Sequence, residues 1–194
     1  MTALSLSERY VALVLKRLDR IEDERLHGLR GCLESVIAHG IPGDILVAGP
    51  EQGAGTVFLR ALLAANRVTD RWLWIASPQG SWRDLDGVRG ALDACNLLDD
   101  VVHFIEGPMW SAVPVTPVET LAMILLESGT GDAVEHLLRN LYPRLALGGY
   151  AIVDDYASSP ECEAAVGRFR DAGGIAGHLL PLSRDCVSWR KERA

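Results

Sequence analysis

Residues 43–56 read Gly-Asp-Ile-Leu-Val-Ala-Gly-Pro-Glu-Gln-Gly-Ala-Gly-Thr, a short apolar run followed at once by a cluster of glycines. The apolar run at residues 45–48 is typical of a buried β-strand, and residues 57–65 are rich in good helix formers. Glycines let the backbone approach a ligand, and a helix start offers unpaired N–H groups and a positive dipole end. The sequence therefore predicts a cofactor-binding turn, with a tight turn that binds nothing as the alternative. The candidate cofactor-binding glycines are Gly49, Gly53 and Gly55.

The composition is that of one globular domain. The chain has 194 residues, of which 48% are hydrophobic and 23% charged, with a formal net charge of −7. Because the acidic balance comes without any basic run, we expect no nucleic-acid partner and no anionic membrane surface. No apolar stretch is long enough to span a bilayer and no leader is recognisable, so a cytoplasmic location is expected. The four cysteines lack Cys-x-x-Cys spacing and are expected to be buried thiols.

Strands and helices alternate along the rest of the chain. Further strands are predicted at residues 71–76, 101–105, 121–126 and 150–153, and a closing hairpin at 178–182 and 186–190. Helices are predicted at residues 88–98, 133–145 and 161–172, with Gly148 and Gly149 as the stop of the middle one. Two further helices are predicted before residue 40, the first opened by a capping box at Ser5.

Polar residues follow three of the predicted strands. In open α/β sheets, ligands bind outside the carboxyl ends of the strands. Asp154 and Asp155, with Glu127 from the neighbouring strand end, are hard oxygen donors and are predicted to form a Mg²⁺ site. The alternative is that one aspartate caps the next helix and the other faces water. Ser77 stands where nucleoside-binding folds carry an acid, and it can give a ribose hydroxyl one bond without charge assistance.

The alternation, the glycine turn and the closing hairpin predict an α/β fold of the class I methyltransferase, Rossmann-like type. We expect a doubly wound, mostly parallel sheet that ends in an antiparallel hairpin. A single domain is expected to span residues 1–194, with a helical cap at 1–40 and the α/β core at 41–194. The cap is expected either to pack on the domain's own core or to form a dimer contact.

Over nearly its whole length the chain resembles the macrocin O-methyltransferase (TylF/MycF) family. The matching stretches are Arg9-Tyr10, Leu29 to Glu34, Gly40 to Asp44, Leu138 to Tyr156 and Trp189-Arg190-Lys191. The resemblance implies an S-adenosylmethionine-dependent enzyme that methylates a hydroxyl group of a glycosylated or polyketide-type natural product. It also implies Mg²⁺ at the carboxylates named above. Richness in Arg, Ala, Gly and Val with only two lysines is typical of a high-GC bacterial genome, and a homodimer is expected.

The chain departs from the family pattern at the cofactor and metal motifs. The family's glutamate at the end of the first strand is replaced by Val47, and its acid after the second strand by Ser77. The family's Asp-Gly-Asp falls on Glu127-Ser128-Gly129, and the following tyrosine on Gly131. These losses leave a second hypothesis open, in which the fold is retained but methylation is lost. The protein would then catalyse another step, such as a cyclisation, or act as a non-catalytic partner.

Overall fold

The sheet of this protein has seven strands in the order β3-β2-β1-β4-β5-β7-β6. The structure is a computed structural model that describes residues 23–50, 53–77, 82–105, 107–127 and 131–192. Neighbouring strands from β3 to β5 are parallel, whereas β7 is antiparallel to both β5 and β6. The strands are β1 (Asp44–Ala48), β2 (Leu73–Ala76), β3 (Val102–Ile105), β4 (Leu121–Leu126), β5 (Leu145–Val153), β6 (Leu180–Pro181) and β7 (Val187–Arg190).

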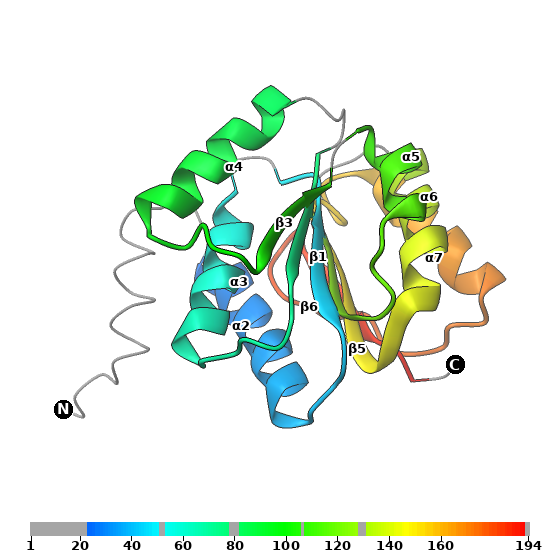
Figure 1. Ribbon diagram of the computed structural model, residues 1–194. Coiled ribbons are helices and arrows are strands. Elements are labelled where there is room, and N and C mark those ends of the chain that lie inside the picture. Colours follow the sequence, from blue (N-terminus) through cyan, green and yellow to red (C-terminus); the bar gives the residue numbers. More distant parts are fainter. Residues whose placement is uncertain (1–22, 51–52, 78–81, 106, 128–130, 193–194) are drawn as a thin grey trace.

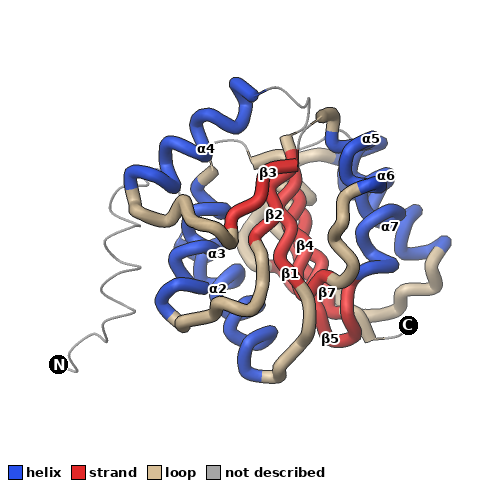
Figure 2. Tube along the Cα trace, in the orientation of Figure 1, coloured by secondary structure: helices blue, strands red, loops and turns tan. Residues whose placement is uncertain are grey.

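Helices cover both faces of the sheet (Figures 1 and 2). One face carries α2 (Asp23–Ala38), α3 (Ala54–Ala65) and α4 (Trp82–Ala94). The other face carries α5 (Met109–Ala112), α6 (Gly131–Leu141) and α7 (Pro160–Ala172), with two short 3₁₀ turns, η1 (Val113–Val115) and η2 (Tyr142–Arg144). Because each central strand is covered on both faces, every residue of β2 and β4 is buried. This doubly wound arrangement and its closing hairpin confirm the predicted fold class.

The predicted helix over residues 133–145 is wrong at its end. Helix α6 stops at Leu141, because Pro143 lies in the next turn and a proline cannot continue the helical hydrogen bonds. Gly148 and Gly149 are therefore no helix stop but lie inside β5, where the pairing with β4 shifts register. Gly148 has φ +82°, and a Cβ on Gly149 would lie 2.7 Å from the carbonyl oxygen of Ala122. Only glycine suits this irregular stretch of the strand.

Helix α2 packs on the domain's own core. Leu26, Leu29 and Leu33 are buried against the sheet face that also carries α3 and α4. At the far end of α2, the Tyr150 hydroxyl of β5 donates to Ser35 Oγ at 3.2 Å. This is the first of the two arrangements expected for the cap, whereas the helix predicted from Ser5 lies outside the described residues.

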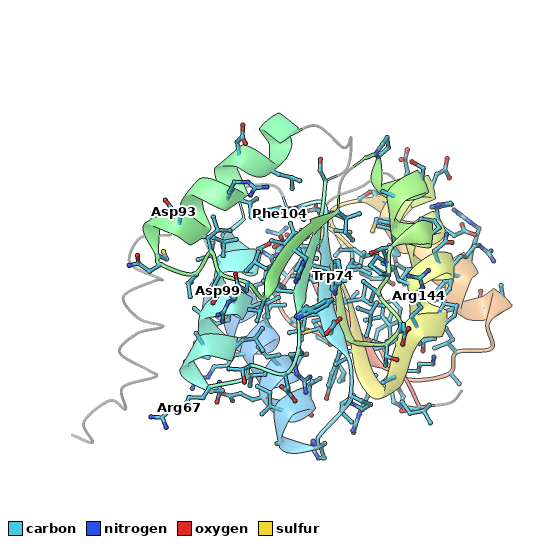
Figure 3. All side chains as sticks on the ribbon, viewed as in Figure 1. Arg67, Trp74, Asp93, Asp99, Phe104 and Arg144 are labelled. Carbon is cyan, nitrogen blue, oxygen red and sulfur yellow. The ribbon has the colours of Figure 1, made fainter. Side chains whose placement is uncertain are left out.

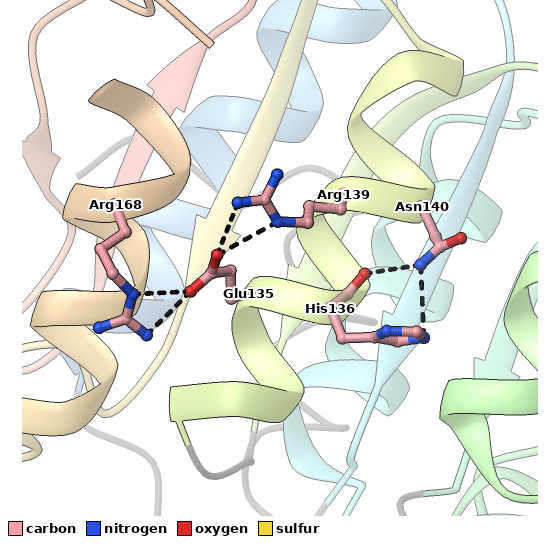
Figure 4. Close-up of polar contacts among 5 residues, drawn as sticks. All are labelled: Glu135, His136, Arg139, Asn140 and Arg168. Carbon is pink, nitrogen blue, oxygen red and sulfur yellow. Dashed lines mark hydrogen bonds and ion pairs between the residues drawn. The ribbon is translucent and has the colours of Figure 1, made fainter. Parts of the chain in front are cut away.

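Two groups of arginine contacts fasten the opposite face. The Arg144 guanidinium donates to the carbonyl oxygens of Pro114, Thr116 and Val118, and so holds the segment before β4 (Figure 3). On the surface, Glu135 of α6 accepts from Arg139 of the same helix and from Arg168 of α7 (Figure 4). The Arg139 bonds, followed by those of Arg168, lower the pKa of Glu135. These contacts join α6 to its neighbours.

All four cysteines are buried. Burial raises the pKa of the Cys32 and Cys162 thiols to about 11. Burial, with the nearby Asp154 charge, raises the pKa of the Cys186 thiol to about 12. These thiols therefore stay protonated at neutral pH and behave as small apolar core residues.

The raised thiol pKa values predict a loss of stability in alkali. An unfolded cysteine loses its proton near pH 9, whereas native Cys32 keeps it to about pH 11. Because the unfolded state then binds fewer protons, the free energy of unfolding falls by up to about 1.4 kcal/mol per pH unit for that thiol. Urea denaturation from pH 8 to 11 should show that the destabilisation by Cys32→Ala shrinks by about 2–3 kcal/mol. A Leu29→Ala control on the same helix should not share this change, and a constant Cys32→Ala difference would contradict the prediction.

Candidate functional site

The carboxyl ends of four strands lie in one row. Ala48 of β1 pairs with Ala76 of β2 and with Leu126 of β4, and Leu126 in turn pairs with Val153 of β5. The next residue of each chain segment continues the row, which in the order of the strands consists of Ser77, Gly49, Glu127 and Asp154. Backbone hydrogen bonds hold it, because the N–H groups of Gly49, Glu127 and Asp154 each donate to the neighbouring strand at 2.8–2.9 Å. The structure thus brings together the residues that were predicted from separate strand ends.

The glycine turn leads from β1 into α3. Gly49 and Gly53 have φ values of +75° and +72°, in the left-handed region that glycine adopts without a steric penalty. Gly53 is the N-cap of α3, and it brings no side chain to cap the first backbone N–H groups. The N-cap residue therefore caps none of the first N–H groups of α3, and the positive dipole end of the helix lies beside the row of strand ends.

The carboxylate of Glu127 lies against the first turn of α3. A Cβ built on Gly55 would stand 2.2 Å from Glu127 Oε1 and 3.3 Å from Arg25 Nη2. Glu127 is only 5% exposed, so its side chain has little room to move aside. The absence of a side chain at residue 55 is what admits the carboxylate, and a negative charge at a helix start is electrostatically favourable.

Arg25 joins the strand ends of β4 and β5. Its Nη2 atom lies 2.5 Å from Glu127 Oε1 and 2.8 Å from Asp154 Oδ2, and the Arg25 and Asp154 side chains are 16% and 17% exposed. Burial lowers the pKa of Arg25, but the attraction of Glu127 and Asp154 outweighs it and leaves the pKa raised. One permanently charged guanidinium thus neutralises part of the charge of two carboxylates.

The carboxylates do not form the predicted metal cluster. Asp155 is exposed, has φ +56° and receives a weak contact from Ser158 Oγ at 3.5 Å. Among the described residues, no group of three or more His, Cys, Asp or Glu side chains is placed to hold a metal ion. With Arg25 on Glu127 and Asp154, this arrangement does not fit a bound Mg²⁺ ion.

Ser77 is fully buried at the end of β2. It lies at the end of β2, as the sequence predicted, and its contact to a ribose hydroxyl stays a prediction. A separate cavity of about 570 Å³ lies at the opposite, amino-terminal side of the parallel strands. Its Lys191 donates to the carbonyl oxygens of Tyr142, Pro143 and Leu145, which is a structural use of the amine. The chemistry predicted from the sequence lies at the strand ends and not in this cavity.

Arg25 is the site residue that sequence reasoning missed. It stands 102 positions before Glu127 in the chain. The spacing of apolar residues in its helix predicts which face is buried, but not which residues the polar side chains contact. The sequence contains only an indirect indication of this residue, because two carboxylates at the ends of neighbouring strands require a nearby cation. In the structure, the Arg25 side chain is that cation.

Comparisons with known proteins show the family and agree with the fold. The sequence model of the Macrocin-O-methyltransferase (TylF) family matches residues 18–81 and 83–191. The chain is 33% identical to demethyldecarbamoylnovobiocin O-methyltransferase of Streptomyces niveus, over 88% of this chain and 74% of the relative. It is 31% identical to 8-demethyl-8-(2,3-dimethoxy-alpha-L-rhamnosyl)-tetracenomycin-C 4'-O-methyltransferase of Streptomyces olivaceus, over 88% and 74%. The solved structure of the O-methyltransferase NovP superposes with a TM-score of 0.82 at 32% identity, covering 88% of this chain and 80% of that one.

Removal of Arg25 should destabilise the fold strongly. Arg25→Met leaves Glu127 and Asp154 without that cation, and we expect a loss of about 2–3 kcal/mol, less than for a fully buried pair because Arg25 and Asp154 are 16% and 17% exposed. Urea denaturation followed by circular dichroism measures the difference. The matched control is Arg30→Met on the same helix, which breaks only an exposed pair with Glu34 and should cost at most about 0.5 kcal/mol. Equal losses in the two variants would contradict a structural role for the Arg25 bridge.

Proposed function

Because the chain belongs to the macrocin O-methyltransferase (TylF) family, we propose that it transfers a methyl group from S-adenosylmethionine to a hydroxyl group of a natural product. The observation that carries this proposal is the row of strand ends beside the glycine turn of α3. This is the edge of an open α/β sheet at which ligands bind.

The chain's own groups suit the cofactor. The glycine turn, where Gly49 and Gly53 bring backbone close to the row of strand ends without side chains, suits the approach of the cofactor. Ser77, three strand-end positions from Asp154 in the row, suits a ribose hydroxyl. S-adenosylmethionine itself supplies a methyl group on a positively charged sulfur, which a hydroxyl oxygen attacks in line as the C–S bond breaks. The protein contributes binding and orientation.

The relatives point to the class of acceptor. One is named for a novobiocin derivative and another for a tetracenomycin that carries a rhamnosyl group. We therefore propose a sugar hydroxyl of a glycosylated metabolite as the acceptor. Transfer would yield a methyl ether and S-adenosylhomocysteine, and the hydroxyl proton would be released.

Mg²⁺ is not part of this proposal. The two carboxylates that would bind it are already engaged by Arg25. In the proposed reaction the acceptor hydroxyl is therefore not coordinated by a metal ion.

Calorimetric titration with S-adenosylhomocysteine tests the cofactor assignment. We expect one site per chain with a dissociation constant in the micromolar range. Ser77→Ala should weaken binding by about 2–12-fold, the effect of one neutral hydrogen bond of 0.5–1.5 kcal/mol.

The control variant is Ser35→Ala, which removes a hydroxyl at the other end of α2, where it meets Tyr150. Its affinity for the cofactor product should equal that of the unchanged protein. No detectable heat at about 1 mM ligand would overturn the methyltransferase proposal and favour a protein that keeps the fold without the cofactor.

A further inference from the structure

The carboxylates at the ends of β4 and β5 already have a resident cation. Glu127 and Asp154 follow directly after paired residues of adjacent parallel strands, so their side chains start from neighbouring positions. Glu127 is buried and Asp154 partly buried, and two such neighbouring carboxylates repel each other unless a positive charge stands between them. In this structure a single nitrogen, Arg25 Nη2, contacts both.

Packing on both sides determines where the Arg25 side chain lies. Leu29, one helical turn further along α2, is fully buried in the core. Gly28 touches the hairpin so closely that a Cβ there would lie 2.6 Å from Leu182 Cβ. Helix α2 is therefore seated directly on the sheet and hairpin, and its first turn delivers Arg25 to the strand ends.

A divalent ion and this guanidinium compete for the same oxygen atoms. Mg²⁺ binds carboxylate oxygens at about 2.0–2.1 Å and needs them turned toward one centre. Oε1 of Glu127 and Oδ2 of Asp154 are turned toward Arg25 Nη2. The Arg25 guanidinium cannot lose its proton, because its pKa is raised from an already high value. To bind there, a metal ion would have to displace a charged group held by the packing of α2.

We propose that Arg25 is a built-in replacement for a divalent cation, so that the strand-end carboxylates work without a metal ion. Arg25 acts as a positioning residue: it fixes Glu127 against the start of α3 and Asp154 at the end of β5. This inference goes beyond methyl transfer, because it concerns only which cation these carboxylates hold.

Titration with Mn²⁺, followed by the electron paramagnetic resonance signal of the free ion, tests the proposal. The unchanged protein should bind no Mn²⁺ more tightly than about 1 mM at this position. Arg25→Met should gain a site that binds Mn²⁺ at least about tenfold more tightly, and Asp154→Asn in that background should abolish it. Arg30→Met, the control on the same helix, should behave like the unchanged protein.

Three results would overturn the proposal. One is tight Mn²⁺ binding by the unchanged protein that Asp154→Asn removes. Another is a folded Arg25→Met variant, judged by circular dichroism, that gains no Mn²⁺ site. The third result applies even if the Arg25→Met variant does not fold. It is a rise in the unfolding temperature of the unchanged protein in MnCl₂, relative to a salt of equal ionic strength, that Asp154→Asn abolishes. Metal binding is read without turnover, so the outcome is separate from that of the methyl-transfer experiments.

Discussion

The hydrogen-bond register of the parallel strands is the constraint on which the rest of the structure depends. Because β1, β2, β4 and β5 end level with one another, four residues distant in sequence become neighbours at one edge. In strands that are buried on both faces, the close packing of their side chains against the helices holds this register, because the interior has no room for side chains of another shape. The chemical groups at the edge are thus positioned by the core and not by the loops that carry them.

Much of this could be predicted from sequence, because apolar runs and glycine clusters have local causes. The strand at residues 45–48, the turn with Gly53 and the closing hairpin lie where their patterns predict. The β5 start was missed because Gly148 and Gly149 look like a helix stop, whereas their reason is the close approach of Ala122. A steric contact between strands leaves no trace in the spacing of residues along one of them.

The candidate site also has a part that the sequence predicts and a part that it does not. The strand-end positions of Ser77, Glu127 and Asp154 follow from topology, and topology follows from the alternation of elements. The partner of Glu127 and Asp154 does not follow from topology, because Arg25 reaches these two carboxylates from α2, far away in the sequence. The sequence analysis predicted a Mg²⁺ ion at these carboxylates, because nothing in the local sequence distinguishes a site for a metal ion from a site for a guanidinium. The pair of Glu135 with Arg139 in Figure 4 contrasts with this, since the two residues are four positions apart on one helix, whereas Arg168, the other partner of Glu135, comes from α7.

The far border of the sheet is a strand of two residues, Leu180 and Pro181. Pro181 has no backbone N–H group, and the strand contains only these two residues that pair with β7. An unrelated chain that approaches this border finds almost no row of hydrogen-bonding groups to copy, so growth of the sheet from molecule to molecule is disfavoured there. The short border strand therefore protects this side of the sheet against aggregation by edge-to-edge pairing, which is a hazard for apolar strands.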